Sequence, residues 1–115
     1  MDPSQLGPNE PALACNARPF SPEQRRRWEE LGASWRAEVA EIRELPDGYA
    51  LRIPSDATTV LAAAEWMTLD RLCCPFFRFA LEIEPEGGPA WVRLTGGGGV
   101  KEFLRRAIEG EDPSP

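Results

Sequence analysis

None of the 115 residues is a histidine. Imidazole is the side chain that most readily serves as a general base near neutral pH, and it is also the commonest metal ligand. Its absence excludes a Cys-His or Ser-His catalytic pair and a zinc finger built from cysteine and histidine. Any chemistry in this chain must therefore use thiols, carboxylates, arginines or the backbone.

Long apolar runs are also missing. No stretch approaches the roughly 18 consecutive apolar residues of a membrane-spanning helix. The N-terminus has neither the basic head nor the apolar segment of a secretory signal peptide. We therefore expect a cytoplasmic protein that has no membrane partner.

Positive charge is in deficit, because 13 lysines and arginines face 19 aspartates and glutamates, for a net charge of −6. A negative chain repels a phosphate backbone, and apart from Arg25, Arg26 and Arg27 the basic residues are scattered among acidic ones. We expect no nucleic-acid partner.

With 42% hydrophobic and 28% charged residues, the composition is that of a folded globular protein, and the length fits one domain.

The first 20 residues contain four prolines among small and polar residues, which predicts an N-terminal arm over 1–20. The sequence SPEQ then combines a capping serine, Ser21, with a proline at the first helical position and a glutamine that completes a capping box. These signals predict a helix from residue 22 to about 38. We expect one domain over 21–110 and a flexible tail over 111–115.

Two hairpins are predicted in the body of the chain. EIRELPDGYALRI alternates around a Pro-Asp-Gly turn, and FFRFALEIE and AWVRLT alternate around PEGGP. An alanine-rich helix lies between the hairpins, and Pro75 ends it at Cys73 or Cys74 because the residue before a proline is disfavoured in helical geometry. A last helix follows the run of four glycines.

This order of elements predicts an α+β fold. We expect a four-stranded antiparallel sheet built from two hairpin-plus-helix units (ββαββα), with an additional N-terminal helix. The exposed face or an edge strand of such a sheet can pair with a second copy of the chain, so a homodimer is a predicted partner state.

The three cysteines are the strongest candidates for chemistry. Because the cytosol is reducing and an odd number of thiols cannot all pair, we do not expect a structural disulfide framework. Thiolates select soft ions such as zinc, copper(I), mercury(II) or arsenite. The sequence thus predicts a metal or metalloid site formed by Cys15, Cys73 and Cys74, with an oxygen from Asp70, provided that the N-terminal arm folds back onto the end of the middle helix.

Helical geometry opposes this interpretation. Consecutive helical residues are about 100° apart, so Cys73 and Cys74 are predicted to point in different directions unless the backbone adjusts at the proline. Cys73 also shares a stripe with Trp66 and Leu69, and cysteine is among the most buried residue types. A structural or protein-interaction module, a homodimer with non-functional cysteines in its core, is therefore the alternative to a non-enzymatic binding protein.

A thiol redox protein is a third interpretation, because neighbouring cysteines can close a strained and easily reduced disulfide. The negative end of the helix dipole, however, opposes a thiolate at this position. Enzymatic activity is left open, and no catalytic residue is assigned.

The segment TGGGGVKEF places glycines before the last helix and a lysine in its first turn. Backbone N–H groups at a helix N-terminus can bind an anion, so Gly98, Gly99 and Lys101 form a candidate anion site. The spacing matches neither a P-loop nor a dinucleotide-binding fingerprint. A flexible turn between strand and helix is the favoured explanation of the glycines.

Several segments together resemble a family of small, uncharacterised bacterial proteins. They are Ala14 with Cys15, ELPDGYALRIP, AEWMTLDRLCCPFFRF with its CCPF junction, and GGPAWVRLTGGGGVKEFL, and the likeness spans about residues 12–108. An acid-arginine pair before the cysteines is matched here by Asp70 and Arg71. The family's Gly-Pro loop is replaced by Gly97 to Gly99, a departure that weakens the anion-site hypothesis. The resemblance implies no activity, cofactor or catalytic residue.

Overall fold

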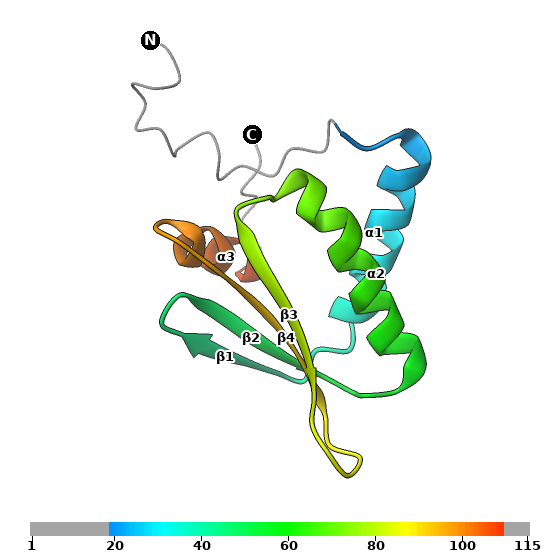
Figure 1. The fold of residues 1–115 in the computed structure, drawn as a ribbon, viewed down its shortest axis with the longest axis vertical. Helices are drawn as coiled ribbons and strands as arrows, with labels where there is room; N and C mark the ends of the chain where they lie inside the picture. Colours follow the sequence, from blue (N-terminus) through cyan, green and yellow to red (C-terminus); the bar gives the residue numbers. More distant parts are fainter. Residues whose placement is uncertain (1–18, 110–115) are drawn as a thin grey trace.

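The computed structural model describes residues 19–109 of the chain (Figure 1). Three helices and a four-stranded antiparallel sheet confirm the α+β class. The elements follow one another as α1 (Pro22–Arg36), β1 (Glu41–Leu45), β2 (Gly48–Ile53), α2 (Ala57–Cys73), β3 (Phe77–Ile83), β4 (Ala90–Gly96) and α3 (Val100–Ile108). The predicted arm lies outside the described residues except for its last two, and the predicted tail over 111–115 lies wholly outside them.

Helix α1 begins at the predicted capping box. The side chain of Ser21 accepts a hydrogen bond from the Gln24 backbone at 3.1 Å, and the Gln24 side chain accepts one from the Ser21 backbone at 2.9 Å. The helix ends at Arg36, two residues before the predicted end. Its early end has a local reason, because the Ala40 backbone already donates to the Arg52 carbonyl at 2.8 Å and so joins the sheet beside β1.

The sheet has the strand order β1-β2-β4-β3, and every neighbouring pair is antiparallel. Alternate residues of the central strands β2 and β4 face one side and are buried in a core shared with all three helices. Leu51 of β2 and Val92 of β4, which are register partners, belong to this core. The helices therefore cover one face of the sheet.

The opposite face of the sheet is polar. Ion pairs join Arg43 and Arg52 to Glu41. Trp91 lies on this face, under the Arg43 guanidinium at 4.5 Å from the ring centroid, and its indole N–H donates to the Glu84 carboxylate at 2.6 Å. An aromatic ring is thus shielded from water on the face that carries no helix.

Helix α2 begins at an aspartate N-cap, Asp56. The Asp56 side chain accepts hydrogen bonds from the Thr59 backbone N–H at 3.0 Å and from the Thr59 hydroxyl at 2.9 Å. The helix ends at Cys73, within the bounds that Pro75 predicts. The chain then turns into β3, so the two adjacent cysteines lie at the junction between a helix and an edge strand.

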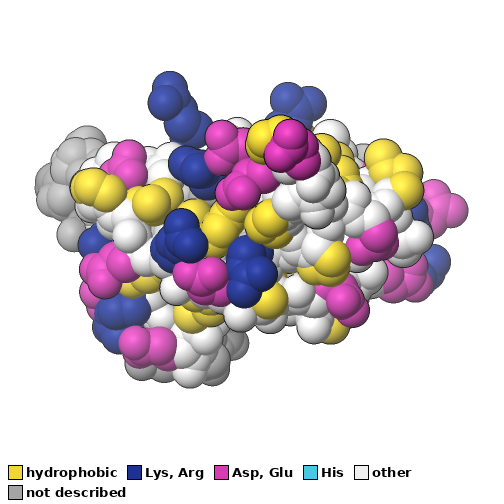
Figure 2. Space-filling view, turned by 90° about the horizontal axis from the view of Figure 1, so that it is seen from below, with side chains coloured by type: hydrophobic (Ala, Val, Ile, Leu, Met, Phe, Trp, Pro, Cys, Tyr) yellow, Lys and Arg dark blue, Asp and Glu magenta, His cyan; other side chains and the backbone are white. Residues whose placement is uncertain are grey.

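Charges of both signs are intermixed on the surface. Figure 2 shows basic and acidic side chains beside one another, with hydrophobic ones between them, on the face seen from below. Between residues 19 and 109, no helix has both the length and the apolar character needed to cross a membrane.

Candidate metal centre

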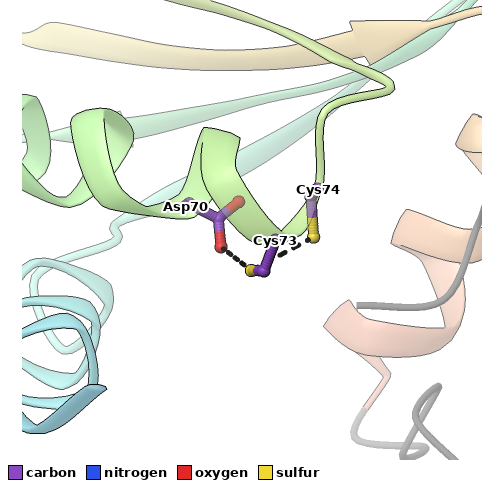
Figure 3. A group of neighbouring side chains, drawn as sticks. All are labelled: Asp70, Cys73 and Cys74. Carbon is purple, nitrogen blue, oxygen red and sulfur yellow. Dashed lines mark hydrogen bonds between the residues drawn. The ribbon is translucent and has the colours of Figure 1, made fainter. Parts of the chain in front are cut away.

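The structure brings three of the four predicted ligands together at the C-terminal end of α2. Figure 3 shows the side chains of Asp70, Cys73 and Cys74 gathered there. One ligand atom from each lies within 4.8 Å of the other two, and all three residues are at most 3% exposed. The remaining predicted ligand, Cys15, lies outside the described residues.

The prediction that the two thiols point in different directions is wrong. The Sγ atoms of Cys73 and Cys74 lie 3.7 Å apart. Cys74 has φ −128° and ψ 65°, outside helical geometry, so the 100° rotation between successive helical residues does not apply to it. Its backbone N–H still donates to the Asp70 carbonyl at 2.8 Å, which holds the residue on the last turn while its side chain turns toward Cys73. Pro75 enforces this change of backbone direction.

The distances suit a bent arrangement of sulfurs around one ion. Two sulfurs about 2.3 Å from a tetrahedral ion are about 3.8 Å apart, and a sulfur and a carboxylate oxygen around it are about 3.6 Å apart. The Sγ–Sγ distance here is 3.7 Å, and Cys73 Sγ lies 3.6 Å from Asp70 Oδ1. A linear S–ion–S unit would need sulfurs about 4.6 Å apart. Tetrahedral and trigonal ions therefore fit with less movement than linear ones.

A second element fixes the carboxylate. The indole N–H of Trp28 on α1 donates to Asp70 Oδ1 at 2.9 Å, so this oxygen accepts from both the indole and the Cys73 thiol. Metal-binding carboxylates are commonly held in this way by an outer hydrogen bond, which sets their orientation. The sequence alone did not single out Trp28 as part of the site. The available signal was chemical, because a buried indole N–H usually finds an acceptor.

A cation lies near the buried carboxylate. Burial lowers the pKa of Arg36, while the negative charge of Asp70 acts in the opposite direction and raises it. Two thiolates and a carboxylate together carry three negative charges. A divalent ion balances two of these charges, and the Arg36 guanidinium, on an exposed residue that interacts electrostatically with Asp70, supplies one further positive charge nearby.

An apolar cleft of about 390 Å³ leads to the cluster. Asp70 and Cys74 form part of its wall, and residues of all three helices and the sheet form the rest. Aromatic rings contribute part of the apolar wall, among them Trp28, Phe77 and Phe103. The cleft provides an approach to the Cys74 thiol, and the Cys73 sulfur lies 3.7 Å behind it.

The same cysteines are also packed in an apolar environment. Cys73 and Cys74 form a small hydrophobic cluster with Phe20, a residue that the sequence placed in the N-terminal arm. Trp28 and Phe77 pack against this cluster. Burial of this kind is what the alternative interpretation, cysteines as core residues, requires.

The candidate anion site has other contacts. Lys101 Nζ pairs with Glu44 Oε2 at 2.6 Å, so its charge is used in a link between α3 and β1. Gly99 has φ 89° and forms the start of α3 without a side-chain cap, which explains why glycine stands there. The space around Gly98 is open, since a Cβ added to it would meet no atom within 4 Å. Anion binding at Gly98, Gly99 and Lys101 stays a prediction.

Comparison of the chain with protein-family models, with curated proteins and with solved structures gave no match. The likeness to small bacterial proteins that carry the CCPF junction stays an expectation from sequence.

Proposed function

We propose that the protein is a cytoplasmic, non-enzymatic binding protein whose cysteine thiolates hold a soft metal or metalloid ion. One observation carries this proposal: two sulfurs and a carboxylate oxygen converge within 4.8 Å at the end of α2. Soft sulfur donors select zinc, copper(I) and related thiophilic ions over magnesium or calcium. The bent geometry favours zinc over divalent ions that prefer a linear pair of sulfurs.

Cys15 is the proposed third thiolate. It precedes Phe20 by five residues, and an extended chain of that length spans at most about 17 Å. Phe20 itself packs against Cys73 and Cys74, so the described chain begins beside the cluster. Cys15 is thus within reach of the ion, and it would raise the donor set to three sulfurs and one oxygen, the number that a closed tetrahedral site needs. As a thiolate it would also add one negative charge beyond those that a divalent ion and Arg36 balance.

Ion uptake exchanges protons for metal. The Cys73 thiol donates to Asp70 Oδ1 in the structure, and thiols must lose their protons to become ligands. Binding therefore releases protons, and Asp70 changes from acceptor of a thiol hydrogen bond to ligand. Trp28 keeps the carboxylate oriented through this change.

Calorimetric titration of the reduced protein with zinc tests the proposal. We expect one zinc per chain, with a binding heat that changes with the ionisation enthalpy of the buffer because protons are released. Asp70→Asn weakens binding, whereas Asp47→Asn, which alters an exposed aspartate in the β1–β2 turn, leaves it unchanged. Equal affinity for the two variants would remove Asp70 from the site.

The second candidate is a structural or interaction module, and two observations favour it. The thiols of Cys73 and Cys74 are 1% and 2% exposed within an apolar cluster. The edge strands β1 and β3 also carry exposed isoleucines, Ile42 at 45% and Ile83 at 55%, and such edges can pair with a second copy of the chain. In this candidate the body is organised as two hairpin-plus-helix units (ββαββα) behind the N-terminal helix, and it forms a homodimer.

Sedimentation velocity of the protein without metal distinguishes the candidates. A dimer that persists in the Cys73→Ala/Cys74→Ala variant, together with no zinc uptake by the wild type, would establish the module. The redox interpretation has less support, because the negative end of the α2 dipole opposes the thiolate that exchange chemistry needs.

A further inference from the structure

One thiol of the pair, that of Cys74, lines a cleft that an inorganic ion does not need. Cys74 and Asp70 share the cleft wall with Trp28, Phe77 and Phe103, and the cleft volume is about 390 Å³. An apolar cavity of about 150 Å³ is enough to hold benzene. The space beside the sulfurs thus accommodates one aromatic ring, and the surrounding rings can contact it edge to face.

We propose that the site takes a trivalent organoarsenical with a single aromatic substituent, whose arsenic bridges Cys73 and Cys74 while the ring occupies the cleft. This inference rests on the proposed function and narrows its ligand class. Two features of the structure support it jointly: paired sulfurs 3.7 Å apart and an aromatic-lined cleft that begins at one of them.

The binding chemistry needs no oxidant or reductant. An arylarsine oxide in water carries two hydroxyl groups on arsenic. Two As–O bonds break and two As–S bonds form, and the two thiol protons leave with the hydroxyl groups as two water molecules. Arsenic stays trivalent throughout, and the sulfurs are bound to arsenic rather than to each other.

The occupied site also balances its charge. An arsenic bound to one carbon and two sulfurs is neutral, so it adds no charge to the apolar cleft. The Asp70 carboxylate remains opposite the Arg36 guanidinium, whose pKa already responds to it. No isolated charge is buried by binding, and this avoids the large desolvation cost of an unpaired ion.

The number of exchangeable groups on arsenic explains why one ring is favoured. A singly substituted arsenical has two positions for sulfur, which matches the Cys73–Cys74 pair. A doubly substituted one has a single position and leaves one thiol unused. Arsenite can use both thiols but leaves the cleft without a ring.

The test compares phenylarsine oxide with arsenite on the full-length, reduced protein. Tryptophan emission reports occupancy directly because Trp28, Trp35 and Trp66 line the cleft, and native mass spectrometry gives the stoichiometry. Ala107→Phe narrows the cleft from an exposed position on α3 without altering a thiol. Ala33→Phe, at an exposed position of α1 that does not line the cleft, is the matched control.

We expect Ala107→Phe to weaken phenylarsine oxide binding about tenfold, the scale on which an apolar pocket discriminates by size. Its affinity for arsenite should stay within about twofold of the wild type, and Ala33→Phe should change neither. Cys73→Ser/Cys74→Ser, checked for folding by circular dichroism, should bind neither compound.

The failures of the two proposals are distinguishable. If arsenite or zinc binds but phenylarsine oxide shows no preference, or if Ala107→Phe weakens both arsenicals equally, the aromatic-ligand inference is overturned and the soft-ion proposal stands. If the wild type takes up no arsenical and no zinc, both are wrong. If the cysteine double variant still binds phenylarsine oxide, the ligand does not use these thiols and the inference also fails.

Discussion

Replacing Trp28 by phenylalanine removes the hydrogen bond that orients Asp70. The bond is 2.9 Å long, and Asp70 is 3% exposed, so water cannot easily replace the lost donor. A hydrogen bond to a charged group contributes about 1.5–3 kcal/mol to the free energy of unfolding. A loss of about 2 kcal/mol corresponds to a fall in Tm of about 8–16 °C for a domain near 100 residues. Urea unfolding and calorimetry measure these quantities.

A double-mutant cycle separates this hydrogen bond from the smaller ring. In an Asp70→Asn background the acceptor is neutral, and neutral hydrogen bonds contribute about half as much, so Trp28→Phe should cost about 1 kcal/mol less there. Trp91→Phe is the matched control. It breaks an indole–carboxylate bond to Glu84 on the opposite face of the sheet, so its cost should not depend on Asp70. A Trp28–Asp70 coupling within about 0.5 kcal/mol of zero would refute the link between α1 and the carboxylate.

The same substitution has a functional consequence. Loss of an outer hydrogen bond to a metal ligand typically weakens metal affinity about 10–100-fold. Trp28→Phe should therefore lower zinc affinity on this scale, and Trp91→Phe should leave it unchanged. Equal zinc affinity for the two variants would show that Asp70 needs no support from α1 or does not bind the ion.

Three further predictions concern the cap of α2, the packing of the sheet and the thiol site. Hydrogen bonds from the Thr59 backbone and hydroxyl lower the pKa of Asp56, so its stabilisation is present above the ordinary aspartate pKa of about 4 and is lost as pH falls through the lowered value. Asp56→Ala should therefore lower Tm at pH 7 and have a smaller effect once the pH is below that lowered pKa. A Cβ at Gly48 would meet a backbone oxygen of β4 at 2.0 Å, whereas one at Gly97 would meet nothing within 4 Å. Urea unfolding should show Gly48→Ala destabilised by about 1–3 kcal/mol and Gly97→Ala changed by less than about 0.5 kcal/mol, and similar values for both would contradict the close strand contact. Zinc at 100 times its Kd should raise the free energy of unfolding by about 2.7 kcal/mol, and Cys73→Ala should abolish the rise; a rise that persists would place the ion elsewhere.

The sequence predicted what depends on local chemistry. The capping box at Ser21 and the proline after Cys74 are signals carried within a few residues, and the helix boundaries beside them follow. The strands were likewise predictable from the alternation of apolar and polar side chains. The pairing of β2 with β4 was not, because it joins segments about 40 residues apart that carry no local mark of their partner.

The same distinction between local and long-range features applies to the candidate site. Residue chemistry alone singled out Cys15, Cys73 and Cys74, with Asp70 beside them, as candidate ligands, since cysteine is the soft donor left in a chain that has no histidine. Their convergence could not be predicted from a helical wheel, because Cys74 leaves helical geometry. The hydrogen bond from Trp28 links residues 42 apart in sequence, and no local pattern contains it.

Native mass spectrometry of the reduced protein, with zinc, copper(I), mercury(II) and arsenite offered in turn, tests the existence of the site most directly. The expected result is one ion per chain for at least one of the four, and none for the Cys73→Ser/Cys74→Ser variant under the same conditions. A wild-type spectrum that shows no stoichiometric uptake of any of them would contradict the proposed function and leave only the fold.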